Sequence, residues 1–342
     1  MKSIAINGIT FQKKESAGIE RYVYQTVNYL DKIIPDDWNV YLLCPQNATL
    51  YLPNLNRIHI IRLPMKGMLR RTFFIRKFLK ISNASYADLT GGICLSQNAM
   101  GCIHDIRYRL FDTYDSFIWR IRGNIDFLSY KLFASKIVTV SHKSKQEICR
   151  ILKIKENKVS VIGPGWNHMD DINEDIHFWK KHKHIQKKHY YYTVASLMPH
   201  KNFKWIYENA KNNPDKLFVI AGKDIGKICK DALKNVIYLG YVSDEENKTL
   251  MKNCIAFIYP SKYEGFGLPP LEALSCGTQI MISDIKVFHE IYQGCATFFH
   301  TDDYNFDFNI SKDIKKEHIR DCLKKYNWNH TAECWIKLME DS

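Results

Sequence analysis

The stretch IAFIYPSKYEGFGLPPLEALSCGTQIMISD, residues 255–284, decides the fold of this chain. It begins with an apolar strand, continues through a loop that contains Gly265 and Gly267, and reaches a Pro-Pro pair that suits the start of a helix. A short helix follows, and Gly277 separates it from a second apolar strand. Two strands joined by a helix are the unit from which parallel sheets are built, so the stretch predicts an α/β fold.

The same alternation of strands and helices continues outward from this stretch. On its N-terminal side, strands are predicted at 3–7, 39–43, 58–62, 136–141, 158–165, 190–195, 216–221 and 235–239. Helices are predicted at 19–32, 65–80, 202–212 and 244–253. Within and beyond the stretch, strands are predicted at 255–259 and 279–282 and helices at 269–276 and 286–292. Ser144 and Glu147 form a capping-box pattern, which predicts a further helix that starts at Ser144 and runs to about residue 152. Two sheets of this kind indicate two Rossmann-like domains.

The length of the chain also favours two domains. With 342 residues it exceeds the size at which a single core usually stops growing. Residues 166–188 are polar, rich in His and Lys, and weakly periodic, so we place a linker there. The predicted domains are 1–168 and 189–325.

The composition indicates a folded protein of the cytoplasm. Hydrophobic residues make up 46% of the chain, and no long disordered tract is apparent. The first residues, MKSIAINGIT, read as a strand and not as a secretory signal. No apolar stretch approaches the roughly 20 residues of a membrane-spanning helix. Ten cysteines occur singly, with no CxxC pair, which fits reduced thiols better than disulfides or a zinc site.

The net charge of +13 predicts attraction to an anionic partner. Much of this charge lies in a segment at 65–80, in which basic and apolar residues interleave. One interpretation is an amphipathic helix on an anionic membrane surface, with its apolar face in the interface. The other is a core helix with a solvated basic face, and the sequence leaves both open.

The turn EGFGLPP within 255–284 has the chemistry of a diphosphate cradle. Glycines allow backbone N–H groups to approach a ligand, and a helix N-terminus concentrates positive potential, so Gly267 and Leu268 are the best-placed amides. Glu264 and Glu272 flank the turn, and a carboxylate accepts hydrogen bonds from two hydroxyls at once, as a sugar or a ribose presents them. The spacing alone slightly favours a structural role, in which Glu264 is solvated and Glu272 complements the dipole of its helix, over ligand binding.

Residues 255–284 closely resemble the donor-site signature of family 4 retaining glycosyltransferases, whose two glutamates match Glu264 and Glu272. The resemblance implies that Glu264 contacts the hydroxyls of the donor sugar and Glu272 the ribose of the nucleotide. It also implies a GT-B fold, in which two Rossmann-like domains face each other across a cleft. The N-terminal domain would bind the acceptor and the C-terminal domain the nucleotide sugar, and a closing helix at 326–342 would cross back to the first domain.

Other segments resemble further motifs of this family. ASLMPHKNFKWIYENA, residues 195–210, resembles the phosphate-binding strand-loop-helix, and Lys201 matches its lysine. The arginine that is common there is replaced by His200 or Ser196, depending on the register. A histidine neutralises a leaving diphosphate only when it is protonated, so we expect Lys201 and backbone amides to stabilise the leaving group.

Three loops complete the resemblance. The loop Gly240-Tyr241-Val242 lies where the family binds the base of the nucleotide. Tyr241 would either stack on that base or pack against other side chains of the protein. SAGIERYVY, residues 16–24, resembles the family's glycine loop, with Gly18 close to the donor phosphate. GCIHDIRY, residues 101–108, resembles a strand end from which His104 would face the donor sugar; taken alone, His104 is more often a core histidine.

The resemblance therefore implies a metal-independent transferase that retains the anomeric configuration. No D-x-D occurs to hold a divalent metal, so no metal or other cofactor is expected. The residues expected to take part in catalysis are Glu264, His104 and Lys201. The residues expected to bind the donor are Gly18, Ser196, His200, Lys201, Tyr241, Val242, Glu264, Gly265, Phe266, Gly267, Leu268 and Glu272.

The expected donor is a GDP-, dTDP- or UDP-linked hexose or deoxyhexose, and the residues named do not decide among the bases. The expected acceptor is a lipid-linked saccharide at the inner face of the cytoplasmic membrane, as in O-antigen or capsule synthesis. A nucleotide-sugar 2-epimerase on the same fold is the alternative. Nucleic acid is not an expected partner because no binding module is apparent. A nicotinamide enzyme is disfavoured because no G-x-G-x-x-G follows the first strand.

Overall fold

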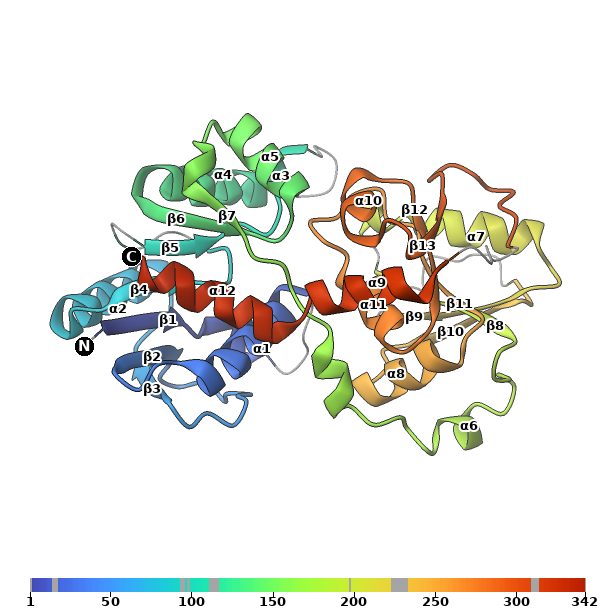
Figure 1. Cartoon of the computed structure of the whole chain (residues 1–342), viewed down its shortest axis with the longest axis horizontal. Helices are drawn as coiled ribbons and strands as arrows, with labels where there is room; N and C mark the ends of the chain where they lie inside the picture. Colours follow the sequence, from blue (N-terminus) through green and yellow to red (C-terminus); the bar gives the residue numbers. More distant parts are fainter. Residues whose placement is uncertain are drawn as a thin grey trace. The chain divides into compact units, whose positions relative to one another are not determined.

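The computed structural model describes residues 2–13, 18–92, 96, 99–110, 117–196, 198–222, 233–308 and 314–341; for Tyr108 and 117–122 it describes the backbone only. The chain forms two compact units. Residues 1–164 and 328–342 make up the first unit, and residues 165–327 make up the second. The chain therefore leaves the first unit once and returns to it for its last helix (Figure 1).

In its described part, the first unit contains a parallel sheet of seven strands in the order β3-β2-β1-β4-β5-β6-β7. The strands are β1 (Lys2–Asn7), β2 (Trp38–Pro45), β3 (Ile58–Leu63), β4 (Ser85–Asp88), β5 (Ala99–Cys102), β6 (Ala134–Thr139) and β7 (Val159–Val161). The helices are η1 (Ile9–Gln12), α1 (Gly18–Ile33), α2 (Met68–Ser82), α3 (Arg107–Leu110), α4 (Phe117–Phe133), α5 (His142–Leu152), η2 (Glu156–Lys158) and α12 (Trp328–Glu340).

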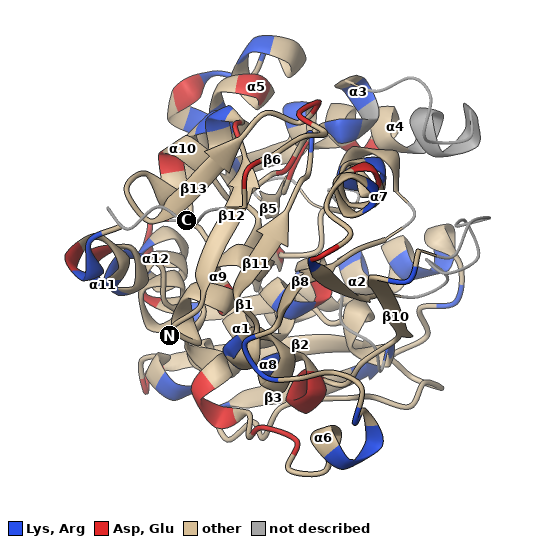
Figure 2. Ribbon diagram, turned by 90° about the vertical axis from the view of Figure 1, so that its right-hand side faces the viewer, with Lys and Arg blue, Asp and Glu red and all other residues tan. Residues whose placement is uncertain are grey.

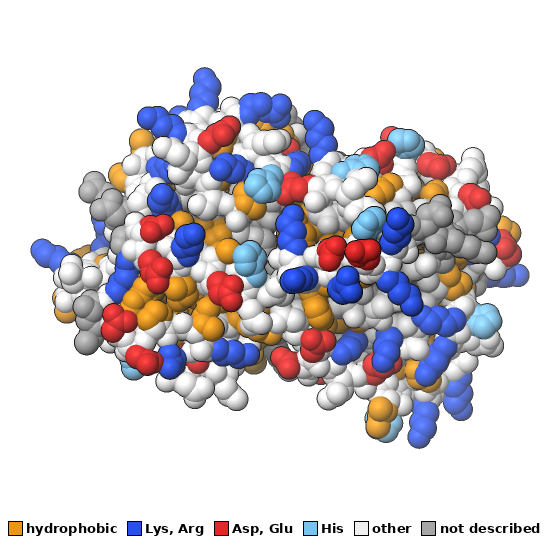
Figure 3. All heavy atoms as spheres, viewed as in Figure 1, with side chains coloured by type: hydrophobic (Ala, Val, Ile, Leu, Met, Phe, Trp, Pro, Cys, Tyr) orange, Lys and Arg blue, Asp and Glu red, His pale blue; other side chains and the backbone are white. Residues whose placement is uncertain are grey.

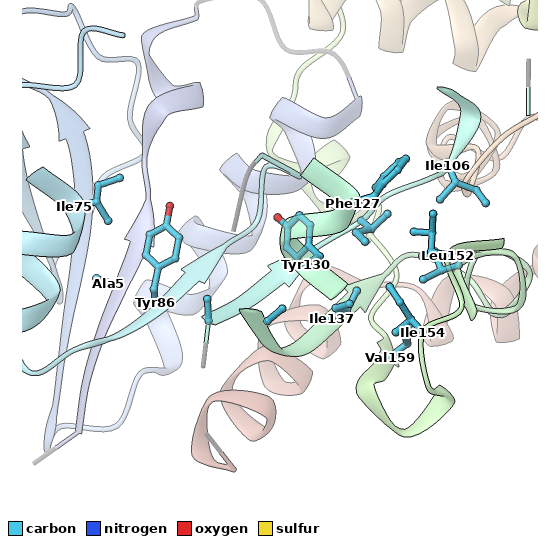
Figure 4. Close-up of a cluster of buried hydrophobic side chains, with 14 of the residues drawn as sticks. Ala5, Ile75, Tyr86, Ile106, Phe127, Tyr130, Ile137, Leu152, Ile154 and Val159 are labelled. Carbon is cyan, nitrogen blue, oxygen red and sulfur yellow. The ribbon is translucent and has the colours of Figure 1, made fainter. Parts of the chain in front are cut away.

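The core of the first unit joins the sheet to its covering helices. Figure 4 shows Tyr130 of α4 beside Ile137 of β6, with Leu152 and Val159 close by. Tyr130 packs so tightly on β5 that a Cβ at Gly101 would lie 1.9 Å from its ring. Strands buried on both faces are the reason that parallel sheets read as apolar runs in the sequence.

The last helix, α12, belongs to the first unit, as the resemblance implies. It packs on α1, where Trp335 Nε1 donates to Tyr22 OH at 2.9 Å. Tyr22 OH in turn donates to the carbonyl of Ile162, and Thr331 Oγ1 donates to that of Gly163 at 2.7 Å. These bonds fasten the end of the chain to the segment that leaves β7.

The second unit contains a parallel sheet of six described strands in the order β10-β9-β8-β11-β12-β13. The strands are β8 (Tyr190–Val194), β9 (Leu217–Ala221), β10 (Val236–Gly240), β11 (Ala256–Tyr259), β12 (Gln279–Ser283) and β13 (Ala296–Phe299). The helices are η3 (Asn167–Asp171), α6 (Phe178–Lys181), η4 (Pro199–Lys201), α7 (Phe203–Asn212), α8 (Asp244–Asn253), α9 (Leu268–Ser275), α10 (Lys286–Tyr292) and α11 (Lys316–Lys325). In Figure 2, β8, β11 and β12 run side by side.

The predicted linker at 166–188 is instead part of the second unit. Met169, Phe178 and Ile185 are buried, so this polar segment still supplies apolar anchors at wide intervals. Lys248 Nζ donates to the carbonyls of Met169 and Ile172 at 2.6 and 2.7 Å. The first unit ends at 164 and not at 168, and the second begins at 165 and not at 189, because these contacts hold the segment to α8.

The predicted start of α5 at Ser144 is also wrong. Ser141 has extended backbone and caps the helix, and its hydroxyl accepts from the backbone N–H of Ser144. Glu147 forms an ion pair with Lys143 at 2.9 Å and takes no part in a capping box. The sequence offers two serines three residues apart, and the end of β6 at Thr139 decides which of them precedes the first turn.

The basic segment at 65–80 forms α2. Ile75 and Leu79 are buried against the sheet, so one face belongs to the core. Met68, Leu69, Phe73 and Ile81 are exposed in addition to Arg70, Arg76, Lys77 and Lys80. A core helix alone accounts for the first face but not for these exposed apolar side chains.

Candidate functional site

The topology of the second sheet identifies one edge for chemistry. The strand order reverses between β8 and β11, and ligands of open α/β sheets bind beyond the carboxyl ends of the strands at such a point. The loop after β8 leads into η4, and the loop after β11 leads into α9. Residues from these two loops are therefore expected to meet.

Lys201 and Glu264 do meet at this point. Lys201 Nζ lies 2.6 Å from Glu264 Oε1, and their side chains are only 23% and 13% exposed. Lys201 Nζ also donates to Tyr259 OH at 2.8 Å, and Tyr259 is the last residue of β11. The two loops thus hold a cation, a carboxylate and a phenol within one hydrogen-bonded group.

The charges in this group stabilise each other. Burial by itself raises the pKa of Glu264, but the Lys201 ammonium outweighs it, so the pKa of Glu264 stays below its ordinary value. Burial likewise lowers the pKa of Lys201, and Glu264 and Tyr259 raise it well above the ordinary lysine value. The pKa of Tyr259 is raised by burial and by the nearby Glu264. At neutral pH the site holds a carboxylate, an ammonium and a neutral phenol.

The glycine turn after Glu264 ends in a helix start without a side-chain cap. Gly267 has a φ of +95° and is the N-cap of α9, and as a glycine it has no side chain to cap the amides at this end of the helix. Leu268 is the first helical residue, and the two prolines after it carry no N–H. The amides of Gly267 and Leu268 are therefore the donors that the sequence predicts for a diphosphate.

Side chains around this turn are fixed by packing. A Cβ at Gly267 would lie 2.5 Å from the ring of Phe288, and the Gly267 carbonyl accepts from Tyr292 OH. Phe266 is buried, and its ring meets that of Tyr326 edge-on at 5.2 Å between centroids. Any contact of Phe266 with a donor would thus come from its backbone.

Glu272 has a partner that the sequence analysis missed. Its Oε1 lies 3.1 Å from His168 Nε2, and both side chains are buried, at 6% and 4% exposed. Because a carboxylate oxygen only accepts, His168 Nε2 carries the proton in this hydrogen bond. The η3 segment thereby orients the carboxylate that is expected to bind the ribose.

The remaining predicted donor residues of the second unit lie in loops at the same edge of its sheet. His200 is buried in η4, and its carbonyl accepts from the Lys262 N–H at 2.7 Å. Ser196 is half-buried in the loop after β8. Tyr241 follows β10 and is 63% exposed, so it is not a core residue, while Val242 is half-buried.

Two predicted residues, Gly18 and His104, belong to the first unit. Gly18 starts α1, and a Cβ built on it would meet nothing within 4 Å, so internal packing does not require glycine there. His104 follows β5, and its Nε2 donates to the Leu89 carbonyl at 2.9 Å. Its ring meets Tyr22 edge-on at 5.0 Å. Burial lowers the pKa of His104, so the ring is neutral at pH 7.

A buried carboxylate supports the loop next to His104. Asp88, the last residue of β4, accepts from Asn7 Nδ2 at 3.0 Å and from the N–H and hydroxyl of Thr90 at 2.8 and 2.6 Å. Asn7 ends β1, and the order of this sheet reverses between β1 and β4. Asp88 therefore anchors the turn at Thr90 from the switch point of the first sheet.

The sequence carried weak signals for the residues that were missed. Tyr259 and Asp88 each end a strand at a switch point, where a polar atom is expected to face the loops. His168 lies in the segment interpreted as a linker. Only its contact with Glu272, which is 104 residues away in the sequence, reveals its role.

No group of three or more His, Cys, Asp or Glu in the described ranges is arranged to hold a metal ion. No helix among the described residues combines the length and hydropathy of a membrane-spanning segment.

Comparison with known proteins agrees with the geometry. Residues 175–319 match the family described as glycosyl transferases group 1. The chain is 30% identical to the O-antigen chain mannosyltransferase RfbU of Salmonella typhimurium over 75% of this chain and 72% of that protein. It is also 30% identical to the N,N'-diacetylbacillosaminyl-diphospho-undecaprenol alpha-1,3-N-acetylgalactosaminyltransferase of Campylobacter jejuni, over 64% of each chain. Sucrose-phosphate synthase from Thermosynechococcus elongatus has the same fold, with a TM-score of 0.77 at 14% identity over 100% of both chains.

Proposed function

Because this chain belongs to the glycosyl transferases group 1 family, we propose that it moves a hexose or deoxyhexose from a nucleotide diphosphate sugar to a lipid-linked saccharide. The product would enter a bacterial surface polysaccharide. Two relatives support this proposal by their names, which are those of an O-antigen mannosyltransferase and of a transferase acting on a diphospho-undecaprenol saccharide. A mannosyl donor is the first to test.

The observation that carries the proposal is the Lys201–Glu264 pair at the switch point of the second sheet. A lysine at this position can bind the diphosphate of a donor, and Glu264 keeps it charged until the donor arrives. The start of α9 adds the amides of Gly267 and Leu268, aimed at an anion. Glu272, held by His168, accepts from the ribose hydroxyls, and Glu264 accepts from hydroxyls of the sugar.

The transfer step follows from these roles. The bond between the anomeric carbon and the diphosphate oxygen breaks, and Lys201 neutralises the charge that grows on the leaving group. The acceptor hydroxyl attacks from the face that the phosphate vacates, its oxygen bonds to the anomeric carbon, and its proton passes to the leaving phosphate. The configuration is then retained, no metal is needed, and His104 contributes a polar contact to the sugar.

We also propose that the first unit works at the inner face of the cytoplasmic membrane. The exposed apolar side chains of α2 stand beside Arg70, Arg76, Lys77 and Lys80, which suits an anionic lipid surface. If R76E/K77E binds anionic vesicles as well as the wild type at low salt, this part of the proposal fails.

Nucleotide binding provides the first test of the donor site. In a thermal-shift panel of UDP, GDP, dTDP, CDP and NAD, one nucleotide diphosphate should raise the Tm by about 5 °C at a hundredfold excess over its Kd. EDTA or magnesium should leave the shift unchanged. Lys201→Ala should abolish the shift, whereas Lys211→Ala, an exposed residue of the same unit, should keep it. A shift with NAD alone would contradict the proposal.

Turnover provides the second test. With the matching sugar nucleotide, product should form only when a lipid-linked acceptor is present. The variant Glu272→Ala should form no product under the same conditions. A donor whose sugar changes without any acceptor would identify a 2-epimerase instead. Loss of turnover on adding EDTA would overturn metal independence.

A further inference from the structure

A cationic hollow lies in the first unit, at the opposite edge of its sheet from His104. It has a volume of about 490 Å³, and five of its lining residues are lysines: Lys131, Lys136, Lys153, Lys155 and Lys158. Among the described residues, no Asp or Glu lines it. The lysines come from the end of α4, the start of β6 and the link between α5 and β7, which all lie at the amino-terminal edge of the sheet. Asp88 and His104 lie at the opposite, carboxyl edge.

Four of these lysines are not neutralised by carboxylates. Within the described ranges, Lys131, Lys136, Lys153 and Lys155 form no ion pair with Asp or Glu. Lys158 is held in place, since its Nζ donates to the carbonyls of Tyr130 and Lys131 at 3.3 and 3.1 Å. Glu156 lies in the same link but does not line the hollow. The four ammonium groups without a carboxylate partner repel each other, and a bound anion relieves that repulsion.

Lys153 has an uncommon backbone conformation at the rim of the hollow. Lys153 ends α5 with a φ of +53°, in the left-handed region. Glycine or asparagine is the usual residue at such a helix end because a Cβ strains this conformation. A lysine at this position accepts the strain and places a cation at the rim of the hollow.

The floor of the hollow is rigid. Ile154, which also lines it, is buried and points toward Ile137 and Val159 in the core (Figure 4). Ile154 therefore anchors the link between α5 and β7 to the core, at the position between Lys153 and Lys155. In Figure 3, Lys and Arg side chains gather over the α4–α5 part of the first unit.

Exposed apolar side chains adjoin the lysines on α4. Leu128 and Leu132 lie one helical turn apart, on one face, and are 55% and 62% exposed; Phe133 next to them is 43% exposed. Lys131, which lines the hollow, stands within this apolar group. Cations beside exposed apolar side chains match a phospholipid surface, which offers phosphates above an acyl layer.

We propose that this hollow binds the phosphate groups of anionic lipid headgroups, while Leu128, Leu132 and Phe133 enter the interface beside it. The site stands apart from α2, which connects β3 to β4 near the other end of the strand order. Two contacts on separate elements would fix how the first unit is oriented on a bilayer. The inference does not depend on which sugar the enzyme transfers.

Vesicle sedimentation of the full chain tests this site. The lipids are phosphatidylcholine alone and an equimolar mixture of phosphatidylcholine and phosphatidylglycerol. Lys153→Glu/Lys155→Glu should lower binding to the mixed vesicles about thirtyfold or more, given the usual contribution of each lysine near an anionic surface. Lys183→Glu/Lys211→Glu, with the same charge change at exposed positions of the second unit, should lower it less than threefold, on the order of a screened long-range effect.

A second variant and two competitors separate the possible ligands. Leu128→Ser/Leu132→Ser should also weaken vesicle binding, which a purely soluble phosphate site would not require. The proposal is overturned if the two charge variants lose binding equally. It is also overturned if inorganic diphosphate or single-stranded RNA binds the wild type as tightly as the mixed vesicles do and loses binding in the Lys153/Lys155 variant.

Discussion

At the scale of single residues, the proposed donor site consists of charged and polar side chains that hold each other in place before any ligand arrives. Lys201 and Glu264 lie on different loops, 63 residues apart in the chain, and form a pair at 2.6 Å. His168 does the same for Glu272 across 104 residues. Removing one member of a buried pair leaves the other without its charge partner, which is why the predicted effects here are large.

We predict that His168 positions Glu272 for the donor. His168→Phe removes the Nε2–H donor and should raise the KM for the sugar nucleotide about ten- to a hundredfold, the range expected for a hydrogen bond to a charged group. The kcat should change much less. His168→Gln keeps a donor and should recover part of the loss. Steady-state kinetics with varied donor decide this.

The expected kinetic split distinguishes positioning from folding. If His168 only filled space in the core, Phe would restore function as well as or better than Gln. A lower Tm for both variants with unchanged KM would contradict the positioning role.

His104 should make the stability of the protein depend on pH. Burial lowers its pKa in the folded chain, although the Leu89 carbonyl and the carboxylates of Asp105 and Asp88 partly oppose this. Below a pH of about 6.5 the unfolded chain takes up the proton first, so folding stability falls as the pH drops from there toward the folded pKa. The slope from this one group is at most about 1.4 kcal/mol per pH unit.

The variant His104→Gln isolates this contribution. Glutamine can still donate to the Leu89 carbonyl but does not titrate. Urea unfolding at pH 5 to 8 should show a shallower slope for the variant below pH 6.5 and parallel curves above it. Identical slopes for both proteins would contradict the assignment. Other histidines, such as His289, titrate equally in both proteins and cancel in the difference.

At the scale of elements, backbone geometry constrains the start of α9. Gly267 has a left-handed backbone, and its missing Cβ leaves room for the fully buried Phe288. Gly277, just beyond the end of the same helix, is also left-handed at a φ of +73°, but a Cβ there would meet nothing within 4 Å. A substitution at Gly277 is therefore a matched control for the same substitution at Gly267.

We predict that Gly267→Ala costs more stability than Gly277→Ala. Both substitutions strain the left-handed backbone by about 1 kcal/mol, and Gly267→Ala adds the clash with Phe288, on the order of 1–3 kcal/mol. Chemical unfolding of the two variants measures the difference. Equal losses would show that Phe288 can move aside, and nucleotide binding should then be retained as well.

At the scale of the whole molecule, the chain closes its first unit with its last helix. Trp328 and Trp335 of α12 are fully buried in that unit, and Trp335 donates to Tyr22. The N- and C-terminal segments of the chain therefore share one core. A late truncation acts on the first unit and not on the second.

We predict that Trp335→Ala destabilises the first unit selectively, by about 3–5 kcal/mol for a buried Trp reduced to Ala. Hydrogen exchange should speed up in β1 and α1 far more than in β8 and β11, because α12 contacts α1. Trp179→Ala, at a residue of the second unit that is only partly buried, serves as the control and should leave β1 unchanged. Equal acceleration in both sheets would contradict independent units.

Much of this organisation could be predicted from local sequence patterns. The strands at 190–194, 217–221 and 256–259 and the helices α8 and α10 follow from apolar runs and periodicity that each segment carries by itself. Lys201, Glu264 and Glu272 follow from motifs of fixed spacing within single strand-loop-helix units. The short range of the residues involved is the reason that the predictions of these strands and helices are confirmed; the roles of Lys201, Glu264 and Glu272 stay predictions.

The sequence by itself therefore determined the α/β alternation and the two sheets, and it singled out Glu264, Glu272 and Lys201 for the proposed donor site. Only the tertiary structure decided that Tyr259 joins Lys201, that His168 holds Glu272, and that 166–188 packs on the second unit. It also decided that Ser141, and not Ser144, caps α5. Strand order brings loops together that are 58 to 104 residues apart, and no local pattern encodes which of their side chains will meet.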